Sequence, residues 1–264
     1  IEYQVYQHYV NHTAPFFLRP LLNIDVAKLK YWERYYWRQA DRVIAVSAHD
    51  RNIMRNLEPD LKVEIVPNGV NLDLFKKKAS WHNPSPTILF VGNFLWLQNT
   101  EAAIMLIDQI LPLVNKKIPK ARVVIAGQHQ PEELVKRASD KVKIVNLKED
   151  DVQGLINAYY QADIFASPIK GPGGTRLKNL AAMASLLPIV SSSVGVRGLG
   201  VVDGDHVYVR NSPSGQASAI ISLLTQPNEA ERLARKARAF VQDKYDYAIV
   251  AKKLSRIYQS LKRS

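Results

Sequence analysis

From residue 86 to residue 225 the chain alternates short apolar runs with amphipathic segments, and this alternation limits its fold more than any other feature. The apolar runs are rich in β-branched residues and have the length of buried strands; they span 86–93, 121–127, 142–146, 164–168, 187–193 and 206–209. Helical spacing of apolar residues fills 100–114, where we expect Thr100 to cap the helix, and then 151–163 and 214–225. Strands that alternate with helices predict an α/β protein with a doubly wound parallel sheet.

Glycine-containing turns follow three of the predicted strands. Gly92 and Asn93 end the first strand, Gly127 ends the second, and 171–174 holds three glycines after the fourth. Sheets of this kind bind ligands outside the carboxyl ends of their strands. We therefore expect the three loops to converge on one ligand-binding crevice.

The stretch GPGGTRLKNLAAMA, residues 171–184, opens a helix and has the composition of an anion site. Backbone N–H groups of Gly173, Gly174 and Thr175 would point a partial positive charge at a phosphate. Arg176 and Lys178 would add a guanidinium and an ammonium. The alternative interpretation is an ordinary glycine turn in which the two cations are solvated surface residues.

The part of the chain before residue 86 is organised differently. It has only two clear strands, 42–47 and 63–70, which suggests the end of a larger Rossmann-like domain whose beginning is missing. We expect a partial N-terminal domain over 1–78, a linker over 79–85, a complete domain over 86–226, and basic helices over 227–264 that pack back on the N-terminal part. In the helix predicted over 26–40, we expect Trp32, Tyr35, Tyr36 and Trp37 to pack in a core; resting on a membrane surface is the alternative.

Charge and composition narrow the choice of partners. The chain has 36 Lys and Arg against 24 Asp and Glu, a net charge of +12, which favours a nucleic acid, an anionic membrane or a phosphorylated ligand. Half of that excess lies in 229–264, with ten basic and four acidic residues. Cysteine is absent and no apolar run reaches the roughly 20 residues of a membrane span, so we expect a cytoplasmic protein. No Walker loop or Gly-x-Ser-x-Gly elbow occurs, which argues against a P-loop ATPase and that type of hydrolase.

Seven blocks of the sequence carry a resemblance to a known family. They are DRVIAVSAHDR, VEIVPNGVNLDLF, ILFVGNFLWLQN, VVIAGQHQP, ADIFASPI, GGTRLKNLAAMASLLPIV and SSSVGVRGLGVVDGDHV. In order and spacing they resemble the second half of a glycosyltransferase family 4 enzyme, a retaining enzyme of the GT-B fold with two facing Rossmann-like domains. The resemblance covers 41–207, and it is specific because all seven blocks occur in sequence. The branch it resembles most has a Trp-x-x-Asn motif, here Trp96 and Asn99.

The resemblance implies an activity and a set of site residues. It implies transfer of a hexose from a nucleotide-sugar donor to a glycan or lipid-linked acceptor at the cytoplasmic face of a membrane, as in polysaccharide biosynthesis. No cofactor or metal is expected, and an anionic membrane surface is a further expected partner. The implied catalytic residues are Arg176 and Lys178, and the implied donor-binding residues are Gly92, Asn93, Gly127, Asn146, Leu147, Gly173, Gly174 and Thr175.

The sequence also departs from the family pattern. The glutamate that bonds the donor ribose in most members is replaced by Ala181, and the small glycine before the next strand is replaced by Leu186. Unpaired ribose hydroxyls would cost about 1–3 kcal/mol, which weakens donor binding without abolishing it. A non-catalytic homologue that acts as a binding or partner subunit is therefore the alternative hypothesis. A nucleic-acid binder is the third, but no nucleic-acid module is present, so we expect no nucleic-acid partner.

Overall fold

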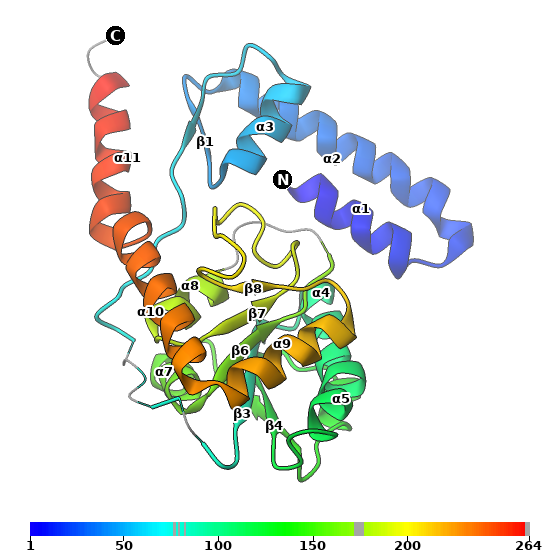
Figure 1. Cartoon of the computed structure of the whole chain (residues 1–264). Helices are drawn as coiled ribbons and strands as arrows, with labels where there is room; N and C mark the ends of the chain where they lie inside the picture. The colour runs from blue at the N-terminus through cyan, green and yellow to red at the C-terminus, as the bar shows by residue number, and fades with distance from the viewer. Residues whose placement is uncertain (76–77, 79, 82, 172–176, 262–264) are drawn as a thin grey trace.

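The computed structural model describes residues 1–75, 78, 80–81, 83–171 and 177–261 (Figure 1). Its largest element is a six-stranded parallel sheet in the order β5-β4-β3-β6-β7-β8, which we call the main sheet. The strands are β3 (Thr87–Asn93), β4 (Arg122–Gln128), β5 (Val142–Asn146), β6 (Ile164–Ser167), β7 (Ile189–Ser191) and β8 (Tyr208–Val209). The order reverses between β3 and β6, as it does in doubly wound sheets. The predicted α/β class and parallel sheet are confirmed.

Helices cover both faces of the main sheet (Figure 1). Ile88 and Phe90 of β3 pack with α4 (Leu97–Met105), a π-helical stretch (Leu106–Ile110), α5 (Leu111–Asn115) and α9 (Pro213–Thr225). Leu89, on the opposite face, packs with α7 (Val152–Gln161) and α8 (Leu177–Ala184). A short helix, α6 (Glu132–Val135), follows β4, and α10 (Pro227–Lys244) contributes residues to both clusters. Residues of β3 therefore alternate between two buried layers, which explains its continuously apolar sequence.

One predicted helix start is wrong. We expected Thr100 to cap the helix, but α4 begins at Leu97 and Thr100 lies buried inside it. The chain turns directly from β3 into the helix because the Asn93 side-chain oxygen accepts a hydrogen bond from the Leu95 N–H at 3.0 Å. This local turn, which competes with other caps, moves the helix start by one turn.

The end of α8 explains the departure at Leu186. Leu186 has a φ of 58°, in the left-handed region. Its N–H donates to the Met183 carbonyl at 3.1 Å, and the Leu187 N–H donates to the Ala182 carbonyl at 3.0 Å. This is the Schellman pattern, in which glycine is the usual residue at the left-handed position. The chain thus keeps a glycine conformation at a residue that carries a side chain.

Residues 1–75, which we call the front section, form a smaller unit. It contains α1 (Glu2–His12), a 3₁₀ turn (Phe16–Leu18), α2 (Arg19–Gln39), β1 (Val43–Ala45), α3 (Ala48–Leu57) and β2 (Val63–Ile65). The strands β1 and β2 pair in parallel as a two-stranded sheet. The buried cluster beside them consists of Ala45, Met54 and Val63.

The prediction that the aromatic cluster of α2 packs in a core is wrong for three of its four members. Trp32, Tyr35 and Tyr36 are 50%, 41% and 64% exposed, and only Trp37 packs partly against the small core. The exposed rings contact one another instead, with centroids 5.5 Å apart between Trp32 and Tyr35. The physical reason is that α1 packs along α2 (Figure 1) but, within the described residues, leaves these three rings exposed.

The chain crosses twice between the front section and the main sheet. After β2 it descends past the sheet, and after α10 it rises again as α11 (Tyr247–Leu261) (Figure 1). The first turns of α11 line a pocket together with Val46 and Ile65, at the ends of β1 and β2. The two crossings are joined, because the Val70 N–H donates to the Tyr245 carbonyl at 2.8 Å and the Tyr247 N–H donates to the Val70 carbonyl at 3.3 Å. The domain boundaries predicted above stay predictions. Among the described helices, none is both long and apolar enough to cross a bilayer.

Candidate functional site

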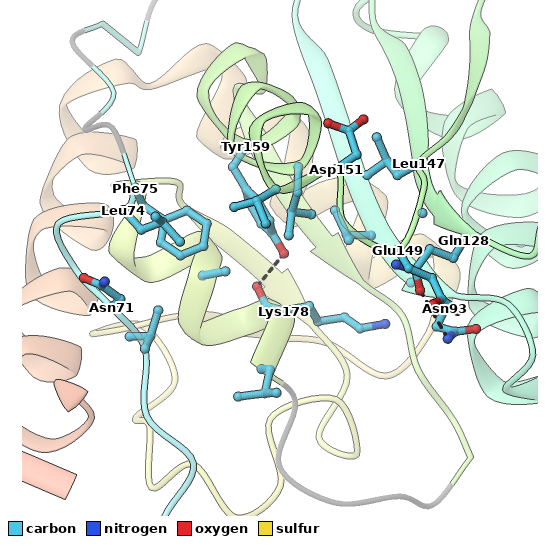
Figure 2. Close-up of a pocket in the computed structure, with 18 of the residues that line it drawn as sticks. Asn71, Leu74, Phe75, Asn93, Gln128, Leu147, Glu149, Asp151, Tyr159 and Lys178 are labelled. Carbon is cyan, nitrogen blue, oxygen red and sulfur yellow. Dashed lines mark hydrogen bonds between the residues drawn. The ribbon is translucent and has the colours of Figure 1, made fainter. Parts of the chain in front are cut away.

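A cavity of about 490 Å³ opens at the carboxyl ends of β3, β4 and β5 (Figure 2). The loops after these strands line one side of it, α7 and α8 line the other, and the descending chain with the start of α11 closes it. Its lining residues are Gly69, Val70, Asn71, Leu74, Phe75, Val91, Gly92, Asn93, Gly127, Gln128, Leu147, Lys148, Glu149, Asp151, Val152, Leu155, Tyr159, Leu177, Lys178, Ala181 and Tyr247. This is the edge at which doubly wound sheets bind ligands.

Two glycines form part of the cavity wall. Gly92 and Gly127 are paired in register at the ends of β3 and β4. Gly127 has a φ of 149°, and a Cβ there would lie 1.7 Å from the Gly92 carbonyl oxygen. Only glycine fits, so bare backbone faces the cavity and a ligand can approach it closely. Next to this pair, the Asn93 amide lies 3.4 Å from the Gln128 side-chain oxygen (Figure 2).

Lys178 brings a cation to the same end of the cavity. It stands in the first turn of α8, and its side chain extends toward Asn93 and Gln128 (Figure 2). Its ammonium donates to the Asn99 side-chain oxygen at 2.7 Å and lies 4.5 Å from the centroid of the Phe90 ring. Lys178 was predicted from the sequence as a catalytic residue, and the structure places it beside Gly92 and Asn93.

The opposite wall, formed by α7 and α8, is apolar. The Tyr159 hydroxyl donates to the Lys178 carbonyl at 3.1 Å (Figure 2). Burial raises the pKa of the Tyr159 phenol far above its usual value, so this group stays neutral. Ala181, 8% exposed, lies on the same wall one turn after Lys178, together with Leu155. The position where the family resemblance implies a ribose-binding glutamate is therefore lined by a methyl group.

The loop after β5 supplies Leu147 and two carboxylates. The Leu147 N–H donates to the Gly127 carbonyl at 2.8 Å, which fixes Leu147 in the cavity lining. Glu149 and Asp151 follow, and Asp151 caps α7 by accepting from the Gly154 N–H at 2.8 Å. Asn146, predicted to bind the donor base, ends β5 in register with Gly127 and does not line the cavity; its role stays a prediction.

Four residues predicted for the site lie outside the described residues: Gly173, Gly174, Thr175 and Arg176. Gly171, just before them, is tightly surrounded, because a Cβ there would lie 2.8 Å from the Gln98 Cβ and 2.9 Å from the His8 Nε2. His8 also lies 3.4 Å from the Glu101 carboxylate. Helix α1 of the front section thus reaches the start of the glycine-rich stretch.

The described residues contain no group of three or more His, Cys, Asp or Glu side chains that could hold a metal ion. The Asp-Gly-Asp run at 203–205 is engaged otherwise, since Asp203 pairs with Arg210 at 2.9 Å and Asp205 pairs with Lys236 at 2.6 Å. The absence of a metal requirement stays a prediction.

Sequence reasoning missed several of the lining residues. Phe75, Tyr159 and Tyr247 reach the cavity from the descending chain, from α7 and from α11. Their contacts depend on how distant segments pack, which no local pattern reports. Gln128 and Lys148 could have been found from their positions in the chain. Gln128 directly follows Gly127 at the end of β4, and Lys148 lies in the loop after β5, at the edge predicted to bind ligands.

Comparison with known families identifies the chain. A model described as "Glycosyl transferases group 1" matches residues 85–226, more than half of the chain, and "Glycosyltransferase Family 4" matches residues 6–74. The chain therefore belongs to the group 1 glycosyltransferases of family 4, and the resemblance noted from the sequence is confirmed.

Individual relatives agree with this assignment. The phosphatidyl-myo-inositol mannosyltransferase of Mycobacterium leprae is 25% identical over 205 residues, which cover 75% of this chain and 54% of the relative. The sucrose-phosphate synthase structure from Thermosynechococcus elongatus has a TM-score of 0.76 at 21% identity and covers 98% of this chain and 66% of that one. Anabaena HepE, solved with UDP and glucose, has a TM-score of 0.69 at 16% identity, covering 84% and 64%.

The solved structures show the fold, and the curated relatives show how much of their length this chain matches. The fold is of the GT-B type, with one complete Rossmann-like domain and part of a second. The chain spans about half the length of the curated relatives it matches.

Proposed function

We propose that this group 1 glycosyltransferase chain carries the donor site of a retaining enzyme that moves a hexose from a nucleotide-sugar to a glycan or lipid-linked acceptor. One observation carries the proposal: the glycine pair Gly92 and Gly127 and the ammonium of Lys178 lie together in a cavity at the carboxyl edge of the main sheet. Bare backbone and a positioned cation are what a diphosphate requires for close approach and charge balance.

The chemistry needs stabilisation of a leaving group. Transfer breaks the bond between the anomeric carbon and a diphosphate oxygen, and the electron pair stays on that oxygen. An acceptor hydroxyl forms the new bond and gives its proton to the departing diphosphate. Lys178, together with Arg176 and the N–H groups of Gly173, Gly174 and Thr175, would stabilise the negative charge as it develops. The site then works without a divalent metal or a cofactor.

The rest of the cavity suits a nucleoside. Leu147, with Asn146 beside it, is proposed to contact the base, and the apolar wall of Leu155 and Ala181 would lie along the ribose. A nucleoside diphosphate is also the ligand of one structural neighbour, Anabaena HepE, which was crystallised with UDP and glucose.

The test is calorimetric titration of the full chain with UDP, GDP and the matching nucleosides. Arg176→Ala should weaken nucleoside diphosphate binding about tenfold to a hundredfold, because a hydrogen bond between charged groups is lost, and should leave nucleoside binding nearly unchanged. Lys120→Ala, which removes an exposed cation before β4, is the matched control and should change neither. Equal losses for both ligands in Arg176→Ala, or no binding by the wild-type chain, would refute the proposal.

A non-catalytic homologue is the second candidate, and one observation favours it. Ala181 offers the cavity a methyl group where a ribose-binding carboxylate is expected from the family. Such a homologue would bind nucleoside diphosphates without turning over a donor. Hydrolysis of UDP-glucose or GDP-mannose by the full chain, measured as release of UDP or GDP, would exclude it.

We also propose that α11 meets an anionic membrane surface from the cytoplasmic side. The basic side chains of α10 are engaged: Arg235 pairs with Glu231 at 2.6 Å, and Lys236 pairs with Asp205 at 2.6 Å. Lys252, Lys253 and Arg256 of α11 are exposed. Each would contribute about 1 kcal/mol near anionic lipid. Sedimentation with phosphatidylcholine vesicles, with and without phosphatidylglycerol, tests this; Lys252→Glu/Lys253→Glu should abolish any dependence on the anionic lipid.

A further inference from the structure

We propose that Asn99 is the positioning residue for Lys178, and that it fixes the Lys178 ammonium at the phosphate end of the cavity by linking it to the end of β3. The inference rests on the proposed function and deepens it. Asn99 itself is not expected to touch the substrate, because it does not line the cavity. It acts through the cation that does.

The geometry joins three elements through one side chain. The Asn99 amide nitrogen donates to the Asn93 carbonyl oxygen at 2.6 Å, and the Asn99 side-chain oxygen accepts from the Lys178 ammonium at 2.7 Å. Asn99 belongs to α4, Asn93 ends β3 and Lys178 belongs to α8. Residues 79 positions apart in the sequence therefore meet at one amide.

The orientation of the amide follows from its partners. The Asn93 carbonyl can only accept a hydrogen bond, so it selects the NH₂ end of Asn99. The oxygen end is then turned toward Lys178, which can only donate. Asn99 is 6% exposed, and the amide has little freedom to turn away. Neither end of the amide is interchangeable with the other.

The neighbouring glycine makes this approach possible. A Cβ on Gly92 would lie 3.0 Å from the Asn99 Cβ and 3.1 Å from its Cγ. Such contacts are tighter than ordinary packing, so a side chain at position 92 would press on Asn99. Gly92 thus has two roles in the cavity. It exposes backbone to a ligand, and it leaves room for the Asn99 amide that binds the Lys178 ammonium.

A lysine needs such a partner if it is to stabilise a leaving group. Its ammonium sits on a flexible four-carbon chain, and ordering this chain costs up to about 2 kcal/mol of rotamer entropy. The Asn99 oxygen and the Phe90 ring, 4.5 Å from the ammonium, hold it before any ligand arrives. A neutral amide keeps the full positive charge available to a phosphate, which a carboxylate in the same place would reduce.

A purely structural role for Asn99 makes a different prediction. If Asn99 only fastened α4 to β3, the bond to the Asn93 carbonyl would be sufficient. Loss of Asn99 would then disturb the whole cavity and weaken nucleosides and nucleoside diphosphates alike. If Asn99 positions Lys178, substitution of Asn99 weakens the binding of the diphosphate and not that of the nucleoside. The same substitution has no further effect on binding in a variant that already lacks the Lys178 ammonium.

The experiment titrates UDP, uridine, GDP and guanosine into the full chain as wild type, Asn99→Leu, Asn99→Ser, Lys178→Met and Asn99→Leu/Lys178→Met. We expect Asn99→Leu and Asn99→Ser to weaken the bound diphosphate about tenfold and the nucleoside less than about twofold. The double variant should bind no more weakly than Lys178→Met, because the two residues act as one unit. Asn99→Ser keeps a short donor near Asn93 and provides a folded variant if Asn99→Leu unfolds.

An exchange of the two residues tests the position of the charge directly. Asn99→Lys/Lys178→Asn returns an ammonium to the same gap between α4 and α8, and it should recover most of the diphosphate affinity lost in Lys178→Met. No recovery, additive losses in the double variant, or equal losses of nucleoside and diphosphate would each overturn the inference. If the wild type binds diphosphate and Asn99→Ser binds it equally well, only this inference fails; if the wild type binds none, the proposed function fails as well.

Discussion

The front section and the main sheet use the same parallel β-α-β unit, yet they bury it differently. In the front section, β1 and β2 flank α3, and the middle residue of β1, Ile44, is 39% exposed. In the main sheet, Ile88, Leu89 and Phe90 of β3 are all 0% exposed. Both strands are apolar, so the difference comes from the number of neighbouring strands and helices. The burial of a strand therefore depends on the strands and helices that pack against it. Substitutions in the main sheet should cost more stability than similar substitutions in the front section.

The largest effect is expected at the glycine pair of the main sheet. Gly127→Ala places a Cβ 1.7 Å from the Gly92 carbonyl oxygen, which no small shift can relieve. We expect a loss of about 4 kcal/mol or more in the free energy of unfolding, or no folded protein. Gly200→Ala is the matched control, because Gly200 also has a positive φ, 66°, but nothing lies within 4 Å of its Cβ.

Thermal unfolding of the two glycine variants separates space from backbone strain. Gly200→Ala should cost only about 1–2 kcal/mol, the price of the left-handed conformation. If both variants lose the same free energy of unfolding, the close approach of the two backbones at Gly127 is not what excludes a side chain there.

The second largest effect compares two ion pairs. Lys78 pairs with Asp163 at 2.8 Å, with side chains only 9% and 6% exposed, and Asp163 also accepts from the Thr87 N–H. Lys78→Met would leave Asp163 as an uncompensated buried charge, at about 3–5 kcal/mol. In the front section, Arg38→Met removes an exposed partner of Glu58 and should cost less than about 1 kcal/mol. Chemical denaturation measures both, and equal costs would contradict the contrast between the two regions.

Sequence reasoning succeeded where periodicity alone decides the outcome. The strand predicted over 142–146 coincides with β5, and the helix predicted over 151–163 is found as α7, because both depend on neighbours close in the chain. It failed at Thr100, where the Asn93 turn started the helix earlier.

In the candidate site, too, some residues could be predicted from the sequence and others could not. Gly92, Gly127 and Lys178 could be predicted because strand ends and glycine turns mark the ligand edge. The partner of Lys178 could not be predicted as such, since Asn99 stands on another helix and meets it only in the folded chain. Likewise, α2 has the spacing of a buried helix, but whether Tyr36 is covered depends on residues elsewhere.

A third prediction concerns the cavity wall beside the main sheet, where Ala181 stands in place of the glutamate that the family resemblance implies. Ala181→Glu should tighten UDP and uridine about tenfold, because a carboxylate can accept from ribose hydroxyls beside Lys178. Calorimetry on both ligands checks this, and a ligand without ribose, inorganic diphosphate, should gain nothing. Unchanged uridine affinity would mean that this wall does not lie along a ribose.

The fourth prediction uses pH to loosen the front section. Hydrogen bonds from Arg38 and Arg34 lower the pKa of Glu58 from 4.5 to about 2. Since the folded pKa is depressed, the stabilisation is fully present above pH 4.5 and is lost as the pH falls toward about 2. Hydrogen exchange should therefore accelerate in α2 and α3 over this window. Glu58→Gln should remove that step, and a step that persists in it would assign the change to another group.

The smallest effect is expected on the exposed face of α2. Tyr36 is 64% exposed, so Tyr36→Ser should change the free energy of unfolding by no more than about 0.5 kcal/mol. Phe165→Ala in the main sheet, where the ring is 0% exposed, should cost about 3–5 kcal/mol by comparison. Chemical denaturation measures the loss in the free energy of unfolding for both variants. A large loss in Tyr36→Ser would mean that this ring is covered in solution, and that the front section finds partners for α2 as the main sheet does for its own helices.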